Sequence, residues 1–362
     1  MFEGCQDFIG NVQAGDAVFF GVRPEPDWPD VESLSSPGLR PNLFAVAAAS
    51  EAIRLAGLAI SDLRGMRVGV CLGSTVGGTN YQEEFLGQYF TGQLPDAAPL
   101  LKCYDTNSAQ FLSRYLGLRG PVLLVNNACT SGADAIGVGS AWLENDVCDM
   151  AICGGTETVL AKIFLGFRSL MLCSPNGCRP FDRDRAGLVL GEGAGIVVLE
   201  RADSPRRAQA LLLGCGMASD SHHPTAPDPQ ARGLDRAVSM AFARSGCALE
   251  AVDFISAHGT GTPSSDLAEG RWIRGHANHA RVVATKGYTG HTLGAAGGIA
   301  AVLTALSLID GKIPPSRGFM EMDPEIGITP TCAVEAADYR LALSLSLGFG
   351  GTNSALLLAR AP

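Results

Sequence analysis

Apolar runs of strand length recur along the chain, and most of them end at glycine or another small residue. Runs that stay apolar at every position predict strands covered on both faces by helices. We expect a first set of strands within residues 66–75, 122–125, 151–158 and 194–200. We expect a second set within residues 208–214, 252–257 and 281–285, and two more strands between residues 339 and 360.

Apolar residues at helical spacing predict helices over residues 42–58, 232–244, 266–276 and 292–310. Another helix is expected to open after Cys129, where Ala133, Ile136 and Ser140 share one face. Before residue 42, the stretch 17–22 is a strand candidate in otherwise irregular sequence. Strands that alternate with helices in this way predict an α/β fold.

The elements fall into two successive sets of similar order, which indicates an internal duplication of structure although no sequence repeat is visible. A polar stretch at residues 201–207 separates the two sets. We therefore expect two similar halves. Residues 1–205 would carry a candidate nucleophilic cysteine, and residues 206–362 would carry two candidate catalytic histidines.

The composition is that of a compact α/β protein: of 362 residues, 46% are hydrophobic and 17% charged, and 45 are glycine. The formal net charge of -9 argues against a general affinity for nucleic acid or for an anionic membrane surface. Eleven cysteines without a CxxC pair fit reduced thiols better than disulfides or a zinc site. Neither a signal peptide nor a membrane span is visible, so we expect a cytoplasmic protein.

Cys129 lies where the apolar run 122–125 gives way to the small residues that open the next helix. The free N–H groups and the positive dipole end at a helix N-terminus favour an anion, and a thiolate is such an anion. Helix N-termini are among the sites where proteins lower the pKa of cysteine from about 8.5. Cys129 is thus either a nucleophile or, like most unpaired cysteines, a small buried apolar residue.

Three glycine-rich loops follow other predicted strands. They are Ala-His258-Gly-Thr-Gly-Thr-Pro, Lys286-Gly-Tyr-Thr-Gly-His291 and Gly-Phe349-Gly-Gly-Thr-Asn. Histidine transfers protons or donates hydrogen bonds near neutral pH, and lysine holds neighbouring groups electrostatically. Free backbone N–H groups of such loops can form an oxyanion hole. A cysteine and two histidines at strand ends therefore predict an acyl-transfer site.

Taken together and in this order, the motifs resemble those of the β-ketoacyl-[acyl carrier protein] synthases, the elongating Cys-His-His ketosynthases of the thiolase superfamily. Two further stretches, residues 179–195 and His223-Pro-Thr-Ala-Pro227, also match, and the similarity runs from about Arg40 to the C-terminus. The resemblance implies a thiolase-like, five-layered αβαβα fold. It also implies a dimer in which the edge strand at residues 122–126 pairs across a twofold axis, as a homodimer or a heterodimer.

The resemblance implies a decarboxylative Claisen condensation in fatty acid or polyketide biosynthesis. Cys129 would take an acyl group as a thioester from an acyl carrier protein. His258 and His291 would hydrogen-bond the thioester carbonyl of malonyl-carrier protein and stabilise the enolate that forms as carbon dioxide leaves. The backbone N–H groups of Cys129 and Phe349 would form the oxyanion hole when the enolate attacks, and Lys286 would order the region of His291.

Further residues match substrate-binding positions of that family. Thr260 and Thr262 match positions near the pantetheine arm, and Phe349 with the adjacent Gly350 resembles a gate that moves on acylation. Arg168 matches a basic position near the tunnel entrance that meets the acidic carrier protein. The resemblance implies neither a metal ion nor a cofactor.

Other residues receive structural interpretations. Asp266 and Glu269 are expected to start a helix and to support the site rather than to act as acid or base. The stretch 179–195 is expected to form a hairpin beside the site. The remaining histidines, His222, His276 and His279, are expected on the surface.

The sequence departs from the family pattern in three places. The family begins with a strand and a helix, and this chain begins roughly after them; the strand at residues 17–22, a partner, or an incomplete start would each account for this. Asp134 stands where a histidine or another polar residue is frequent. Ala300 replaces a glutamate common nine residues after His291, which leaves the support of Lys286 in question.

Three alternatives are weighed against the condensing enzyme. A thiolase proper would carry a second reactive cysteine where this chain has Phe349, and the initiating Cys-His-Asn synthases would lack His291. A tunnel-shaping or chain-length partner of a ketosynthase heterodimer would usually lack Cys129, and it is kept as the alternative. The acyl chain length and the pathway, whether fatty acid, polyene or aromatic polyketide, stay open.

Overall fold

The computed structural model describes residues 40–362 except residues 78, 80, 99 and 102–106. In this part of the chain, a four-stranded sheet has the order β2-β1-β3-β4 and a five-stranded sheet the order β5-β11-β10-β6-β7. The strands of the first sheet are β1 (Val68–Gly73), β2 (Val122–Val125), β3 (Met150–Glu157) and β4 (Gly193–Glu200). Those of the second are β5 (Ala210–Ser219), β6 (Phe254–Ser256), β7 (Arg281–Val283), β10 (Leu341–Gly348) and β11 (Thr352–Arg360). A small third sheet pairs β8 (Lys312–Ile313) with β9 (Glu335–Ala336).

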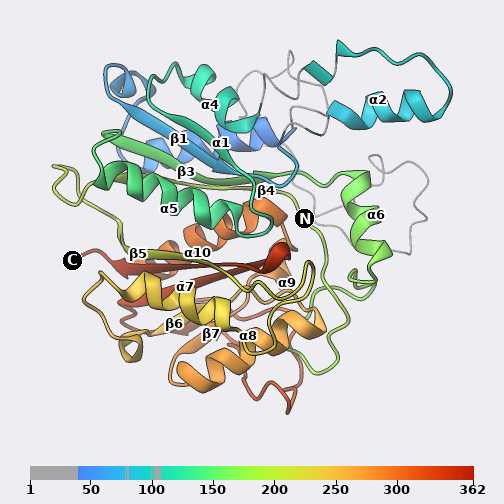
Figure 1. Ribbon diagram of the computed structural model, residues 1–362. Helices are drawn as coiled ribbons and strands as arrows, with labels where there is room; N and C mark the ends of the chain where they lie inside the picture. Colours follow the sequence, from blue (N-terminus) through green and yellow to red (C-terminus); the bar gives the residue numbers. More distant parts are fainter. Residues whose placement is uncertain (1–39, 78, 80, 99, 102–106) are drawn as a thin grey trace.

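Helices form three layers around the two large sheets (Figure 1). The outer face of the first sheet is covered by α1 (Arg40–Leu55) and α4 (Ser108–Leu116). Between the sheets lie α5 (Ser131–Glu144) and α10 (Ala296–Asp310), and the outer face of the second sheet is covered by α7 (Arg232–Phe242) and α8 (Pro263–His276). The expected five-layered α/β fold is confirmed. The strand candidate at residues 17–22 lies outside the described residues. The expectation that the chain lacks the family's first strand and helix concerns the same region and is not tested by the structure.

Further helices lie beside or within these layers. At one end, on the right in Figure 1, lie α2 (Tyr81–Phe90) and α6 (Ala161–Ser169). The short helices are η3 (Ile60–Leu63), η4 (Leu249–Ala251), α9 (Lys286–Thr289), η5 (Leu293–Ala295) and η6 (Phe349–Gly351).

The two large sheets share one topology over four strands. In the first, β1 pairs in parallel with β2 and β3, and β3 pairs antiparallel with β4. In the second, β6 pairs in parallel with β7 and β10, and β10 pairs antiparallel with β11. The structure is therefore duplicated without a visible sequence repeat. The division into residues 1–205 and 206–362 stays a prediction.

The two central helices meet backbone to backbone where they begin. A Cβ atom added to Gly132 of α5 would lie 2.7 Å from the backbone nitrogen of Gly298 and 2.8 Å from the carbonyl oxygen of Gly294. Only glycine permits so close an approach. The contact joins one helix from each half, and the two helices begin just after Cys129 and His291.

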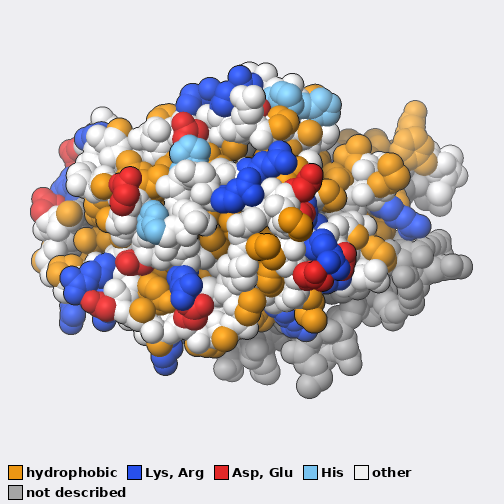
Figure 2. Space-filling model, turned by 90° about the horizontal axis from the view of Figure 1, so that it is seen from below, with side chains coloured by type: hydrophobic (Ala, Val, Ile, Leu, Met, Phe, Trp, Pro, Cys, Tyr) orange, Lys and Arg blue, Asp and Glu red, His pale blue; other side chains and the backbone are white. Residues whose placement is uncertain are grey.

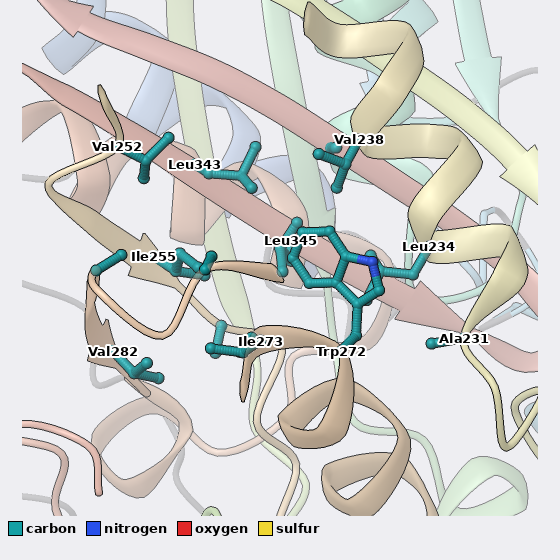
Figure 3. Close-up of a cluster of buried hydrophobic side chains, with 14 of the residues drawn as sticks. Ala231, Leu234, Val238, Val252, Ile255, Trp272, Ile273, Val282, Leu343 and Leu345 are labelled. Carbon is teal, nitrogen blue, oxygen red and sulfur yellow. The ribbon is translucent and has the colours of Figure 1, made fainter. Parts of the chain in front are cut away.

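A cluster of buried side chains fixes α7 and α8 on the second sheet. Trp272 of α8 lies between Leu234 of α7 and Leu345 of β10 (Figure 3). Its indole N–H donates to the exposed carboxylate of Asp235 at 3.1 Å, so the large side chain is buried without leaving an unpaired donor. Because α8 begins at Pro263, directly after the loop that follows β6, this packing also fixes that loop.

Most predicted elements are confirmed, with shifts at their ends. The strand expected at residues 208–214 continues to Ser219, and the helix expected at residues 292–310 begins with the 3₁₀ turn η5. The sequence pattern does not predict α2, α4 or α6.

The prediction of a hairpin at residues 179–195 is wrong. The β-bridges of this stretch go to other segments, with Leu190 bridging to His291 and Asp182 to Met322, and its internal backbone hydrogen bonds near Asp182 are single turns rather than a hairpin ladder. The stretch is an irregular connection to β4 that ties the first half to the second.

One helical segment of the described residues, Leu293–Asp310, is long and apolar enough to cross a membrane by length and composition, with a mean hydropathy of 1.7. It comprises η5 and α10, and 61% of it is buried inside the molecule. Its place between the two sheets accounts for its apolar character.

Candidate active site

Cys129 stands in the turn between β2 and α5, where the sequence places it. Ala128 adopts a φ of 52°, in the left-handed region. The Ser131 hydroxyl accepts the N–H of Asn127 at 2.8 Å and donates to the carbonyl of Ala128 at 2.6 Å. The turn sets Cys129 into the wall of a pocket, where the residue is 5% exposed.

Burial raises the pKa of the Cys129 thiol to about 11, because a thiolate loses its hydration there. The ammonium of Lys286 and the backbone N–H groups of Phe349 and of Cys129 itself lower this pKa, but they do not outweigh burial. The lowering of the pKa expected at a helix N-terminus is therefore wrong in its net direction. At neutral pH the resting thiol is protonated, and a neighbouring base must take its proton.

His291 is placed to be that base. Its Nε2 lies 3.1 Å from the Sγ of Cys129, and its backbone N–H donates to the carbonyl of Val189 at 2.6 Å. Burial, and then the charge of Lys286, lower the pKa of His291 well below the ordinary range. The ring is therefore neutral at pH 7 and one of its nitrogens can accept a proton.

His258 follows β6 and faces the same pocket, with its ring centre 5.3 Å from that of His291 and the two planes at 88°. Lys286 donates to the carbonyl of His258, and its Nζ lies 3.4 Å from Nδ1 of the same residue. Because an ammonium group only donates, Nδ1 acts as the acceptor and the ring proton is on Nε2. Burial, Lys286 and His291 lower the pKa of His258 well below its ordinary range, so this ring is a neutral donor.

Glu269 of α8 supports this arrangement by binding the backbone of the loop that carries His258. Its carboxylate accepts the N–H groups of His258 at 2.6 Å and of Gly259 at 2.8 Å. Burial lowers the pKa of Lys286, and the charge of Glu269 is the largest effect in the opposite direction. Lys286 itself is hydrogen-bonded to His258, and Glu269 acts on it through its charge.

Asp266 holds the next part of the same loop. It accepts the N–H groups of Phe181 at 2.7 Å, of Thr260 at 2.9 Å and of Gly261 at 3.1 Å. The hydroxyls of Thr260 and Thr262 lie 2.8 Å apart, and both residues line the pocket. Asp266 and Glu269 thus bind backbone, in line with the interpretation that they support the site.

Phe349, directly after β10, also lines the pocket. Its ring stacks on that of Phe167 of α6, with centres 5.4 Å apart and an angle of 25°. Gly350 has a φ of 80°, and its N–H donates to the carbonyl of Pro224 at 2.7 Å, but it does not line the pocket. Arg168 follows Phe167 on α6 and is exposed.

The structure thus brings together seven of the nine predicted residues around one pocket or directly behind it, and it leaves Gly350 and Arg168 outside. The pocket has further walls that sequence reasoning did not assign: Phe167, Leu172, Leu188, Thr225, Pro227, Ser264, Ser265, Leu347 and Gly348. Of the remaining histidines, His222, His276 and His279 are exposed, as expected.

Glu157 is a further buried residue that sequence reasoning missed. It ends β3 and accepts hydrogen bonds from Ser74, Thr75, Val76 and Gly294. The charge of Glu157 raises the pKa of Cys129, so it lies within electrostatic reach of the thiol. A carboxylate as the last residue of an otherwise largely apolar, buried strand, in Gly-Gly-Thr-Glu157, was the available signal.

A thiol beside a neutral imidazole, a second imidazole that donates, and two converging backbone N–H groups define an acyl-transfer centre that works through a thioester. On the duplicated five-layered fold, this is the site of a ketosynthase of the thiolase type. The geometry of the site and the sequence motifs therefore both indicate a ketosynthase.

Comparisons with known proteins agree. The Beta-ketoacyl synthase N-terminal domain matches residues 39–204 and its C-terminal domain matches residues 209–320. The 3-oxoacyl-[acyl-carrier-protein] synthase 2 of Synechocystis sp. is 36% identical over 334 residues, which cover 86% of this chain and 80% of that protein. The chain belongs to the β-ketoacyl synthase family. It is therefore an acyltransferase that carries out a condensation in fatty acid or polyketide biosynthesis.

Two solved structures show the same fold. The ishigamide ketosynthase/chain length factor matches with a TM-score of 0.84 and 33% identity, over 89% of this chain and 82% of that one. A ketosynthase in complex with its chain length factor from Xenorhabdus doucetiae matches with a TM-score of 0.82 and 30% identity, over 97% and 88%. The thiolase-like fold expected from the motifs is confirmed.

Proposed function

We propose that Cys129 is the nucleophile of a β-ketoacyl-[acyl carrier protein] synthase that condenses an acyl group with malonyl-carrier protein. The observation that carries the proposal is the 3.1 Å approach of His291 Nε2 to the Cys129 sulfur, in a pocket also lined by His258. The substrates are thioesters on an acyl carrier protein.

In the first step the thiol attacks the carbonyl carbon of the acyl-carrier thioester. His291 takes the thiol proton as the new C–S bond forms and returns it to the carrier's thiolate as the old C–S bond breaks. The backbone N–H groups of Cys129 and Phe349 stabilise the oxyanion between these events.

In the second step malonyl-carrier protein enters the same pocket. The bond to its terminal carboxylate breaks, carbon dioxide leaves, and the electron pair forms an enolate whose oxygen accepts hydrogen bonds from Nε2 of His258 and from His291, which must carry its ring proton on Nε2 in this step. The enolate carbon attacks the acyl-Cys129 carbonyl through the same oxyanion hole. The tetrahedral intermediate expels the Cys129 thiolate and releases the β-ketoacyl-carrier product, and the thiolate takes up one proton from solvent, in place of the proton that left with the first carrier. Lys286 keeps His258 in the donor tautomer throughout.

The carrier protein would approach over α6. Phe167 and Phe349 form the stacked pair that must part to admit a pantetheine arm, and Thr260 and Thr262 line its path. Basic and acidic side chains are interspersed on the face seen in Figure 2, without a large field of one sign. Among the cations that would meet an acidic carrier over α6, we place the exposed Arg168.

A second subunit would pair at β2. This strand lies at the edge of the first sheet, and its Val122 and Leu123 are 38% and 42% exposed. Exposed apolar edge strands attract a partner strand. The two similar solved structures are described as a ketosynthase with a chain length factor, so the partner is either a second copy of this chain or such a subunit. We place this assembly in the cytoplasm.

The test is the intact mass of the protein after incubation with an acyl-carrier protein, alone and with candidate partner subunits. We expect an adduct of the acyl mass on the wild type and on Cys148→Ala, a matched buried cysteine, but not on Cys129→Ala. Malonyl-carrier protein should then discharge the adduct as β-ketoacyl product. An adduct found only on an added synthase would overturn the proposal and support the tunnel-shaping alternative.

A further inference from the structure

Asp134 is a buried carboxylate that the proposed reaction does not use. It lies on the first turn of α5, and the residue is 2% exposed. A carboxylate of this kind is costly unless donors surround it. The hydrogen-bond partners of Asp134 therefore show which segments of the site this carboxylate holds together.

The donors to Asp134 come from both sides of the nucleophile. The side-chain amide of Asn127 donates to Oδ2 at 2.6 Å, and the Thr130 hydroxyl donates to the same oxygen at 2.8 Å. Asn127 precedes Cys129 by two residues and Thr130 follows it. One carboxylate oxygen thus spans the turn that contains the left-handed residue Ala128.

The other oxygen of Asp134 connects to the second half of the molecule. Ser354 of β11 donates to Oδ1. This strand begins at Thr352, immediately after the loop that carries Phe349, and the Thr352 hydroxyl lies 3.3 Å from that of Thr130. Asp134 therefore joins the Cys129 turn to the base of the Phe349 loop.

We propose that Asp134 is a positioning residue of the oxyanion hole, which fixes the N–H of Cys129 relative to the N–H of Phe349. The inference rests on the proposed function, because it assigns these two N–H groups to the acyl oxyanion. The two loops are already in tight contact, since a Cβ on Gly348 would lie 3.1 Å from the Cys129 nitrogen. Small displacements of such donors cost large factors in rate.

The substitution Asp134→Asn tests this because it keeps the shape of the side chain. The amide oxygen can still accept from Asn127 and Thr130, but the NH₂ then faces Ser354, whose hydroxyl must turn from donor to acceptor and loses its bond to a charged oxygen. The link between the Cys129 turn and β11 is therefore weakened. We expect acylation of Cys129 and overall condensation to slow by about tenfold to a hundredfold, with a smaller effect on KM. Ser354→Ala should act in the same direction by less, and the two changes together should not add.

Decarboxylation of malonyl-carrier protein without an acyl primer is the discriminating measurement. It relies on His258 and His291 rather than on the two N–H groups, so Asp134→Asn should leave its rate within about twofold of the wild type. Ser344→Ala, another buried serine in the same sheet, is the matched control and should change neither rate.

Equal losses in acylation and decarboxylation would overturn the inference, because they would mark a general structural role. Unchanged acylation in both Asp134→Asn and Ser354→Ala would overturn it as well. Failure of the wild type itself to acquire an acyl group on Cys129 would instead refute the proposed function.

Discussion

The two halves of the molecule have the same strand topology but different strand ends. The loop after β2 carries Cys129 and the loop after β7 carries Lys286 and His291, and α5 and α10 follow these loops. The loop after β6 carries His258, whereas the corresponding loop after β1 begins with Ser74 and Thr75. The duplicated topology thus places strand ends at equivalent positions in the two halves, but only some of these strand ends carry a side chain of the candidate active site.

Two buried glutamates show the difference between the halves. Glu157 in the first half gathers the loop after β1 and the start of η5 by accepting from Thr75 and Gly294. Glu269 in the second half accepts the backbone N–H groups of His258 and Gly259. One carboxylate joins packed loops, and the other orients a reacting residue. The thiol of Cys129 comes from the first half and its candidate base, His291, from the second, so neither half contains the complete site.

The largest effect is expected from removing a histidine of the second half. His258→Ala and His291→Ala should slow condensation by about 10²- to 10⁴-fold, because the enolate loses a donor. His291→Ala should also slow acylation, while His258→Ala should spare it. Steady-state condensation and intact-mass acylation rates measure the two effects.

The matched change in the first half is Ser74→Ala, at the corresponding strand end. It removes a hydrogen bond to Glu157 at 2.9 Å and should leave the condensation rate within about threefold. A loss as large as that of His258→Ala would show that the two strand ends are not chemically different.

The next effect concerns the thiol before substrate binds. A pKa of about 11 predicts that only about one Cys129 in a thousand is a thiolate at pH 8. Since burial raises the pKa, the thiolate fraction grows about tenfold per pH unit up to pH 10 without a plateau. The rate of iodoacetamide alkylation, followed by peptide mass mapping at each pH, measures this.

Exposed Cys332 in the second half provides an internal reference for reagent access. A plateau in the alkylation of Cys129 below pH 8 would contradict the prediction. It would show that the N–H groups of Cys129 and Phe349 outweigh burial.

The two glutamates give the third effect. Glu269→Gln should lower condensation by about tenfold or more, because an amide cannot accept both N–H groups of the His258 loop. Glu157→Gln should instead destabilise the fold by about 1–3 kcal/mol, with nearly wild-type turnover per folded molecule. Thermal unfolding and condensation rates of both variants measure the pair. Equal effects of the two variants on turnover would remove the distinction between the halves.

The sequence was sufficient to predict the features that depend on local patterns of residues. Continuous apolar runs gave the strands, and glycine loops after them located Cys129, His258, His291 and Phe349. Of the unpredicted helices, α4 did carry a signal, since Ala109, Leu112 and Leu116 are buried at helical spacing, and the sequence interpretation did not use it. The sign of the Cys129 pKa shift was missed because burial depends on packing from both halves. The hydrogen bonds of Glu157 to the loop after β1, and of Glu269 to the backbone of the His258 loop, depend on contacts that spacing along the chain does not reveal.

The smallest effect tests how the halves are joined. Gly132→Ala places a Cβ 2.7 Å from the Gly298 nitrogen, and neither backbone can move away without separating α5 from α10. We expect a loss of about 1–3 kcal/mol in the free energy of unfolding, from denaturant titration. Gly166→Ala on α6 is the matched control, since a Cβ there meets nothing within 4 Å, and it should be neutral or stabilise by up to about 1 kcal/mol. If Gly132→Ala proved as harmless as Gly166→Ala, the halves would be joined by their apolar layers rather than by this backbone contact.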